Sequence, residues 1–179
     1  APYIVDRLNT KTSTTTLSSS GDVYSSEEQY NYEVNLLKQI KKRSTNSGLI
    51  SDFITENNEF DAYGNIIQKK ISAPGMVNRI ENYEYDTTTH RFLVKKIDSN
   101  LQETTYTYNL STGLVLTETL PSNSGYPLKT TYVYDKWGKV LTVTNYLGKN
   151  ITYAYFNISA NRGVLKTTTS SDGSISKTI

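Results

Sequence analysis

Aromatic and polar residues alternate along most of the chain, most clearly over residues 132–144. Tyr132 and Tyr134 stand two positions apart, so in a strand both project from one face of the sheet. Asp135 can bond the backbone two residues on, and Gly138 can adopt a positive φ, which predicts a tight turn between them. β-Branched residues then resume the alternation. The stretch predicts one β-hairpin.

The same pattern recurs along the chain, which predicts an array of repeats. The second aromatic residues of the successive copies are Tyr32, Phe60, Tyr85, Tyr108, Tyr134 and Tyr155, and they are separated by 28, 25, 23, 26 and 21 residues. The first aromatic residues of the same copies are Tyr30, Tyr83, Tyr106, Tyr132 and Tyr153. The turn residues of the motif are Asp61, Gly64, Asp86, Gly113, Asp135 and Gly138. A loose period of this kind is expected when strands are fixed in length and turns vary.

Composition favours strands, because the chain has 15 Tyr against 4 Phe and 1 Trp and is rich in Thr. We therefore expect an all-β fold of consecutive antiparallel hairpins that form a curved, spiralling sheet. Residues 1–179 read as a single array of about seven hairpin units, in which residues 4–17 are the return strand of an earlier unit. Residues 175–179 begin a strand whose aromatic segment does not follow, so we expect a fragment of a much longer chain.

Individual segments refine this picture. Residues 34–42 allow a short amphipathic helix or a strand, and the repeat frame favours the strand. We predict turns at residues 44–48, 73–75 and 171–174, and a longer loop between Asp86 and Leu93, where the motif lacks its glycine.

Charge excludes few classes of protein. The formal net charge is +2 and the basic residues are dispersed, which argues against a nucleic-acid partner. The one basic cluster, at residues 38–43, is interpreted as a solvated hairpin end rather than a phosphate site. A mean hydropathy of −0.52 indicates that one face of the sheet is wet, or covered by something outside this chain. No apolar span long enough for a membrane helix is present.

Catalytic chemistry finds little support. The absence of cysteine excludes disulfides and thiolate chemistry, although it leaves secretion open. The single histidine, His90, lies in a polar loop and is interpreted as a surface residue rather than a base. Asp61, Asp86 and Asp135 share one repeat position, where an aspartate caps a turn. No metal-ligand spacing and no nucleotide or cofactor motif is found, so we expect a non-enzyme.

The repeat resembles a known motif, the Rhs or YD repeat, whose usual form is close to YxYDxxGRL. Residues 132–140 match it best, with Lys139 where the family often has Arg. Residues 60–66 follow, with Phe60 in place of the second tyrosine. The other copies keep only part of the motif, and the resemblance covers roughly residues 22–179.

The resemblance implies a role. In Rhs proteins, toxin-complex C components and teneurins, many such hairpins join into a ribbon that spirals into a hollow shell, and in bacterial members the shell encloses a C-terminal toxin. Our expectation is a structural shell segment of a secreted or cell-surface protein. Its partners are then the rest of the same polypeptide, with its further repeats and enclosed C-terminal domain, and secretion machinery or surface glycans. The alternative is an adhesin segment that binds carbohydrate through an exposed tyrosine ladder.

Overall fold

The computed structural model describes residues 7–16, 22–46, 49–122, 125–158, 161–169, 173 and 175–178. The chain divides into two compact units, Ala1–Tyr83 (unit 1) and Glu84–Ile179 (unit 2), and each is described by itself. Every regular element in the described ranges is a β-strand, and paired strands are antiparallel. The predicted all-β class is confirmed.

Unit 1 is a sheet in which strands pair in the order of the chain. The strands are β1 (Thr10–Thr16), β2 (Val23–Glu33), β3 (Leu36–Asn46), β4 (Leu49–Ile50), β5 (Ile54–Phe60), β6 (Ile66–Ser72) and β7 (Arg79–Tyr85), the last of which crosses the boundary between the units. β4 lies off the main series and pairs with β3. The strand prediction for residues 34–42 is confirmed from Leu36 onward, because Val34 and Asn35 form the preceding turn with φ of 43° and 74°.

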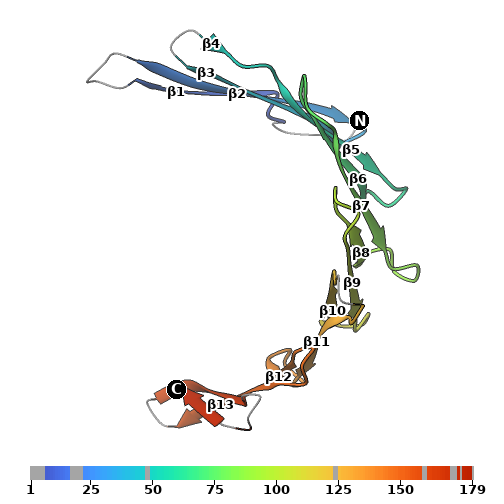
Figure 1. The fold of residues 1–179 in the computed structure, drawn as a ribbon, viewed down its shortest axis with the longest axis vertical. Coiled ribbons are helices and arrows are strands. Elements are labelled where there is room, and N and C mark those ends of the chain that lie inside the picture. Colours follow the sequence, from blue (N-terminus) through green and yellow to red (C-terminus); the bar gives the residue numbers. More distant parts are fainter. Residues whose placement is uncertain are drawn as a thin grey trace. The chain divides into compact units, whose positions relative to one another are not determined.

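Unit 2 follows the same rule, as the labelled strands of Figure 1 show. Its strands are β8 (Leu93–Ile97), β9 (Glu103–Tyr108), β10 (Val115–Leu120), β11 (Leu128–Tyr134), β12 (Val140–Thr144), β13 (Asn150–Ile158), β14 (Asn161–Thr169) and β15 (Ile175–Thr178). The predicted return strand over residues 140–144 is confirmed with those bounds. The predicted long loop before Leu93 is also confirmed, and His90 supplies the positive φ, 55°, that glycine supplies in other copies.

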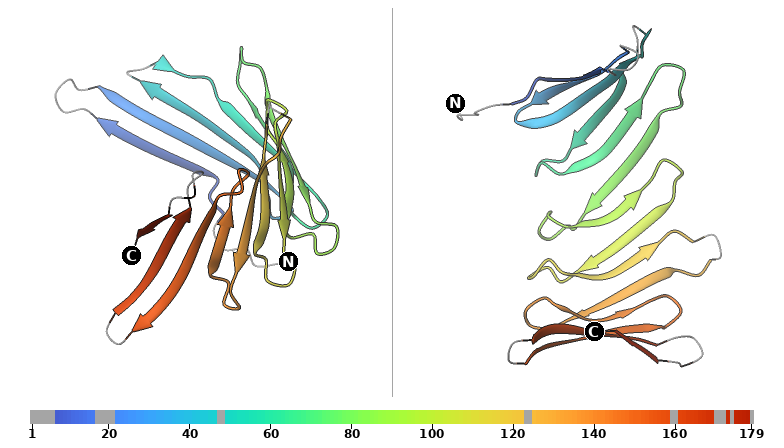
Figure 2. Two further views of the ribbon diagram at one scale, coloured as in Figure 1. Left: turned by 60° about the horizontal axis from the view of Figure 1, so that its bottom comes forward. Right: turned by 90° about the vertical axis from the view of Figure 1, so that its left-hand side faces the viewer.

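The sheet of each unit is a single layer (Figure 2). None of the described hydrophobic side chains is buried, and the buried side chains that the structure describes are polar: Asn58 is 6% exposed and Asp86 is 8% exposed. Each hairpin is therefore stabilised by its backbone ladder and by pairs of side chains on neighbouring strands rather than by a core.

The hairpin of residues 132–144 shows how the sequence sets the geometry. Tyr132 and Tyr134 lie on one face, opposite Val133, which is 50% exposed. The Asp135 carboxylate accepts a hydrogen bond from the Trp137 amide (2.8 Å), and Gly138 has a φ of 79°. The register shifts by one residue where Tyr134 pairs with Val140, which marks a bulge.

Two expectations were wrong. Residues 44–46 continue β3 instead of forming a turn, and residues 47–48 lie outside the described residues. The basic cluster at residues 38–43 lies along β3 rather than at a hairpin end, and Lys42 and Arg43 pair with Glu28 (3.3 Å) and Glu27 (2.6 Å) on β2. The acidic residues of β2 thus pair with the basic residues of β3 along a polar stretch of the β2–β3 ladder. Parts of the predicted segments 4–17 and 171–174 also lie outside the described residues.

Leu101 gives the first prediction. It has a φ of 63° and is 84% exposed in the turn after β8, a conformation that disfavours branched side chains but tolerates asparagine. We expect Leu101→Asn to raise the free energy of unfolding by about 1 kcal/mol in urea denaturation. Leu147→Asn is the control, because Leu147 is also exposed but does not have a positive φ. Equal effects of the two substitutions would contradict the strain argument.

Candidate functional site at the hairpin ends of unit 2

The tyrosine ladder of unit 2 lies on one face of β9 to β12. Ring centroids are 6.4 Å apart both for Tyr106 with Tyr108 and for Tyr132 with Tyr134. Glu118, opposite Tyr106 in the ladder, accepts a long hydrogen bond from the Tyr132 hydroxyl (3.4 Å). The four tyrosines are half-buried, so the rings pack against each other and their neighbours in the sheet.

Burial is the main cause of the tyrosines' altered acidity. It raises the pKa of Tyr106, Tyr108, Tyr132 and Tyr134, and the Glu118 carboxylate adds to the increase for the first three. Among these four, the hydroxyls of Tyr132 and Tyr134 donate hydrogen bonds within the sheet.

The second tyrosine of a motif couples successive hairpins. The Tyr134 hydroxyl donates to the carbonyl of Val115 (2.7 Å), and the Tyr155 hydroxyl donates to the carbonyl of Val140 (2.9 Å). Val115 and Val140 occupy the same place in successive hairpins, since each pairs with a second tyrosine at a bulge. The hydroxyl thus reaches from one hairpin to the bulge of the previous one.

In unit 1, a different side chain makes the hydrogen bond to the bulge of the preceding hairpin. Phe60 replaces the second tyrosine and has no hydroxyl. Asn58, in the place of the first tyrosine, donates from Nδ2 to the carbonyl of Leu37 (3.1 Å). Leu37 pairs with Tyr32 at a bulge, as Val115 pairs with Tyr108. Sequence reasoning did not single out Asn58. The replacement of both tyrosines of the motif, by Asn58 and Phe60, was the sign that this hairpin is joined to its neighbour in another way.

The remaining motif residues lie in equivalent elements. Tyr30 and Tyr32 lie in β2, where the Tyr30 hydroxyl bonds Glu28. Tyr83 and Tyr85 lie in β7, and the Tyr83 hydroxyl donates to Glu81 (2.5 Å). Tyr153 lies in β13. Gly64 and Gly113 close turns with φ of 89° and 75°.

The turns of the motif are capped in the same way, by the side chain of the residue that begins each turn. Asp61 accepts from the amides of Tyr63 (2.8 Å) and Asn65 (2.9 Å), as Asp135 does from Trp137 and Lys139. Burial alone would raise the pKa of Asp61, but hydrogen bonds led by the Asn65 side chain outweigh it and lower that pKa. Asn109, which stands at the aspartate position of its copy of the motif, caps its turn with the same geometry. Asp98 and Asn145 do so too, and sequence reasoning did not single them out.

Asp86 is the most enclosed of the caps. Its carboxylate accepts from the amides of Thr89 (2.5 Å), Arg91 (2.9 Å) and Phe92 (2.9 Å), and from the Thr89 hydroxyl. Burial alone would raise the pKa of Asp86, but these hydrogen bonds outweigh it and hold the pKa far below its ordinary range. The carboxylate is already occupied by protein donors, so it serves the turn.

This arrangement predicts an acid sensitivity. The folded-state pKa of Asp86 lies below the unfolded value of about 3.9, so its contribution to stability is complete above that pH and is lost as the pH falls towards the folded-state pKa. We expect the urea midpoint to fall steadily as the pH is lowered below about 4, and Asp86→Asn to flatten this dependence. An unchanged pH profile in the variant would contradict the assignment.

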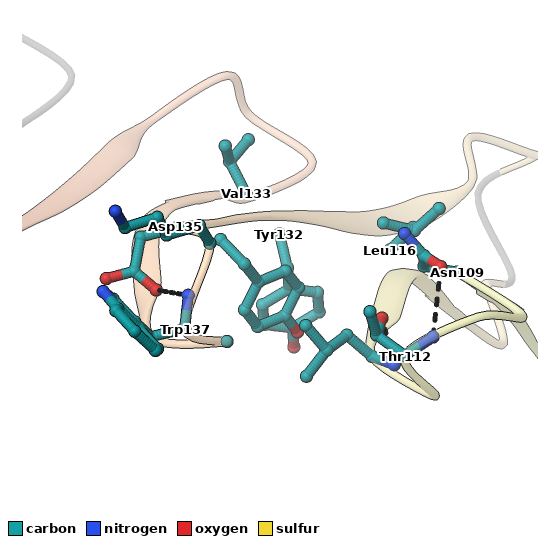
Figure 3. Close-up of a pocket in the computed structure, with 11 residues that line it drawn as sticks. Asn109, Thr112, Leu116, Tyr132, Val133, Asp135 and Trp137 are labelled. Atoms are coloured by element: carbon teal, nitrogen blue, oxygen red, sulfur yellow. Dashed lines mark hydrogen bonds between the residues drawn. The ribbon is translucent and has the colours of Figure 1, made fainter.

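A groove lies between two neighbouring hairpin ends of unit 2 (Figure 3). Its volume is about 780 Å³, and its lining includes Asn109, Thr112, Leu116, Tyr132 and Trp137. Trp137 is 77% exposed, and the Lys136 ammonium lies 5.3 Å from its ring centre. The groove therefore presents an accessible aromatic face beside polar amide and hydroxyl groups.

His90 lies in the turn between β7 and β8. No cluster of three or more His, Asp and Glu side chains that could hold a metal occurs among the described residues. Within those same residues, no helix has the length and apolar character needed to cross a membrane.

Comparisons with known proteins support the fold. The consecutive antiparallel hairpins of each unit support a distant Rhs-like fold. The chain is similar to a crystal structure of TcdB2-TccC3-Cdc42, in which TcdB2-TccC3 is an Rhs-containing toxin-complex protein, with a TM-score of 0.55 and 11% identity. The match covers 92% of this chain and 10% of that chain, so this chain spans about a tenth of its length. No protein-family model matches the chain, and no curated protein matches it in sequence.

Proposed function

We propose that this chain is a structural segment of an Rhs-type shell in a secreted or cell-surface protein, and that the shell encloses a C-terminal toxin or effector. The observation that carries the proposal is the single-layered sheet of hairpins in which none of the described hydrophobic side chains is buried. Such a sheet gains stability from its neighbours along the array, as repeat proteins do. The Rhs-like fold supports this role.

The proposed role is non-catalytic. Further repeats of the same polypeptide would pair with the outer strands, and the enclosed domain would face one side of the sheet. Secretion machinery would export the complete protein. The aspartates support this view, because Asp61, Asp86 and Asp135 are each bonded to the backbone of their own turn.

The first test is the intact mass of the native polypeptide that carries this segment. A chain many repeats longer than 179 residues, with a divergent C-terminal region, is expected. A complete and monomeric product of 179 residues would overturn the shell, because so few hairpins cannot enclose a domain.

A second test asks which faces of the sheet are accessible. Val133 and Val143 lie on opposite faces of one hairpin, since Val143 pairs with Tyr132, and the segment has no cysteine of its own. We expect Val133→Cys and Val143→Cys in the native protein to differ in labelling by a large PEG-maleimide, with one face protected. Both should react in the isolated segment. Equal labelling in the native protein would contradict encapsulation.

Carbohydrate binding is a second candidate, and the specific observation that favours it is the exposed Trp137 beside the groove. The tyrosine ladder is half-buried, so an aromatic platform for a sugar ring would be Trp137 rather than the ladder. Because Trp137 is the single tryptophan, its fluorescence reports this site alone. A saturable change on titration with soluble oligosaccharides, absent in a Lys136→Ala variant, is expected for a glycan site. No change across a panel of oligosaccharides would exclude it.

A further inference from the structure

Asn58 combines deep burial with an unmet hydrogen-bonding need. Its side chain is 6% exposed, and Nδ2 donates to the Leu37 carbonyl at 3.1 Å. Its Oδ1 is buried and has no hydrogen-bond partner, the one such atom found among the described side chains. Buried acceptors are normally paired, so this oxygen marks a place where a donor is expected.

A lysine and a glutamate flank this amide on the same face of the sheet. Lys69 of β6 is the direct partner of Asn58 in the antiparallel ladder, and directly paired residues project to the same side. Glu56 lies two residues before Asn58 on β5 and therefore shares its face. The Lys69 ammonium lies 3.4 Å from the Glu56 carboxylate, and these side chains are 30% and 26% exposed.

Apolar residues flank Glu56 and Asn58, while Lys69 has Glu81 of β7 as its direct ladder partner on the other side. The ladder places Ile71 opposite Glu56, Ile40 on the other side of Glu56, and Phe60 next along β5 from Asn58. All three are half-buried.

We propose that Lys69 and Asn58 join in an intramolecular isopeptide bond, with Glu56 as the proton carrier. Glu56 first takes a proton from the Lys69 ammonium, which leaves Nζ neutral and nucleophilic. The protonated carboxyl then donates to Asn58 Oδ1, which polarises the amide. Nζ attacks Cγ, the Cγ–Nδ2 bond breaks, and the departing nitrogen leaves as ammonia after taking up the proton that Nζ releases. No oxidant or cofactor is consumed.

The Leu37 carbonyl has a positioning role in this step. By accepting from Nδ2 it turns the amide so that Oδ1 points away from β3. The new amide nitrogen keeps one hydrogen and can donate to the same carbonyl. The product would therefore retain the bond that couples β5 to the preceding hairpin.

A second lysine lies nearby but has other contacts. Lys38 pairs with Glu33 (3.7 Å), and its ammonium lies 5.4 Å from the centre of the Phe60 ring. Lys69, in contrast, is the direct ladder partner of Asn58. It also forms an ion pair with Glu56, a carboxylate on the same face as Asn58. It is therefore the expected nucleophile.

The test is the intact mass of the purified 179-residue chain, which should be lower than the sequence mass by one ammonia. Trypsin has no site between Ser44 and Gln68, so both residues fall in one peptide that should resist cleavage at Lys69. Cleavage after Glu59 should open this peptide and leave its two parts joined. Lys69→Arg keeps the charge but cannot attack, and Glu56→Gln keeps the shape but cannot carry the proton.

Each outcome is decisive. Loss of ammonia in the native sequence, with the full mass in both variants, supports the proposal. The full mass in a native-sequence sample that is folded by circular dichroism overturns it. A loss of ammonia that persists in Lys69→Arg shows a cyclic imide at an asparagine or a link from another lysine, and also overturns it.

Discussion

Replacing Gly113 with alanine is expected to lower the free energy of unfolding by about 2–3 kcal/mol. Gly113 has a φ of 75°, where an L-residue is strained, and a Cβ there would lie 3.1 Å from Phe92 Cε1. Phe92 stacks on Tyr108 with centroids 5.1 Å apart, so it cannot withdraw without disturbing the ladder. Urea denaturation of the whole chain measures the loss.

Gly138 is the matched control for this prediction. Its φ is 79°, but an added Cβ would make only ordinary contacts, 3.6 Å and 3.7 Å from the methyl groups of Leu114. We expect Gly138→Ala to show the backbone strain alone, about 1–2 kcal/mol. If the two alanine variants lost the same stability, the close approach of Phe92 would have no energetic role.

Tyr134→Phe is expected to lower the free energy of unfolding by about 1–2 kcal/mol, because it removes the donor to the Val115 carbonyl while keeping the ring. The loss should appear as weaker coupling between the β9–β10 and β11–β12 hairpins. Hydrogen exchange of the backbone amides in β11 is the measurement, and faster exchange is expected there.

Tyr132→Phe provides the comparison within the same strand. Its hydroxyl makes a 3.4 Å bond to Glu118, which is long for an O–H donor. We expect a loss of less than about 0.5 kcal/mol. A larger loss for Tyr132→Phe than for Tyr134→Phe would show that the ladder, and not the bond to the bulge, joins the hairpins.

Local chemistry made much of the fold predictable. The alternation of Tyr132 and Tyr134 set the faces of β11, and Asp135 with Gly138 set the turn, so β12 was located to the residue. The recurrence of this pattern was enough to predict consecutive antiparallel strands. The prediction worked where each hairpin is specified by its own residues.

The features that sequence reasoning missed depend on neighbouring strands. β3 extends through residues 44–46 because β2 offers partners opposite them, although their composition is typical of a turn. Asn58 acquires its role from the Leu37 carbonyl, which lies 21 residues away in the chain. The exposed Trp137 beside the groove likewise follows from how two turns lie next to each other in unit 2.

The lack of buried hydrophobic side chains among the described residues has a thermodynamic consequence. The heat capacity change of unfolding arises mainly from apolar surface that becomes hydrated, and the described side chains keep much of that surface in contact with water already. The stability curve of the chain should therefore be flat against temperature, with weak curvature and little cold denaturation. A protein built in this way would hold nearly constant stability over a wide range of temperature.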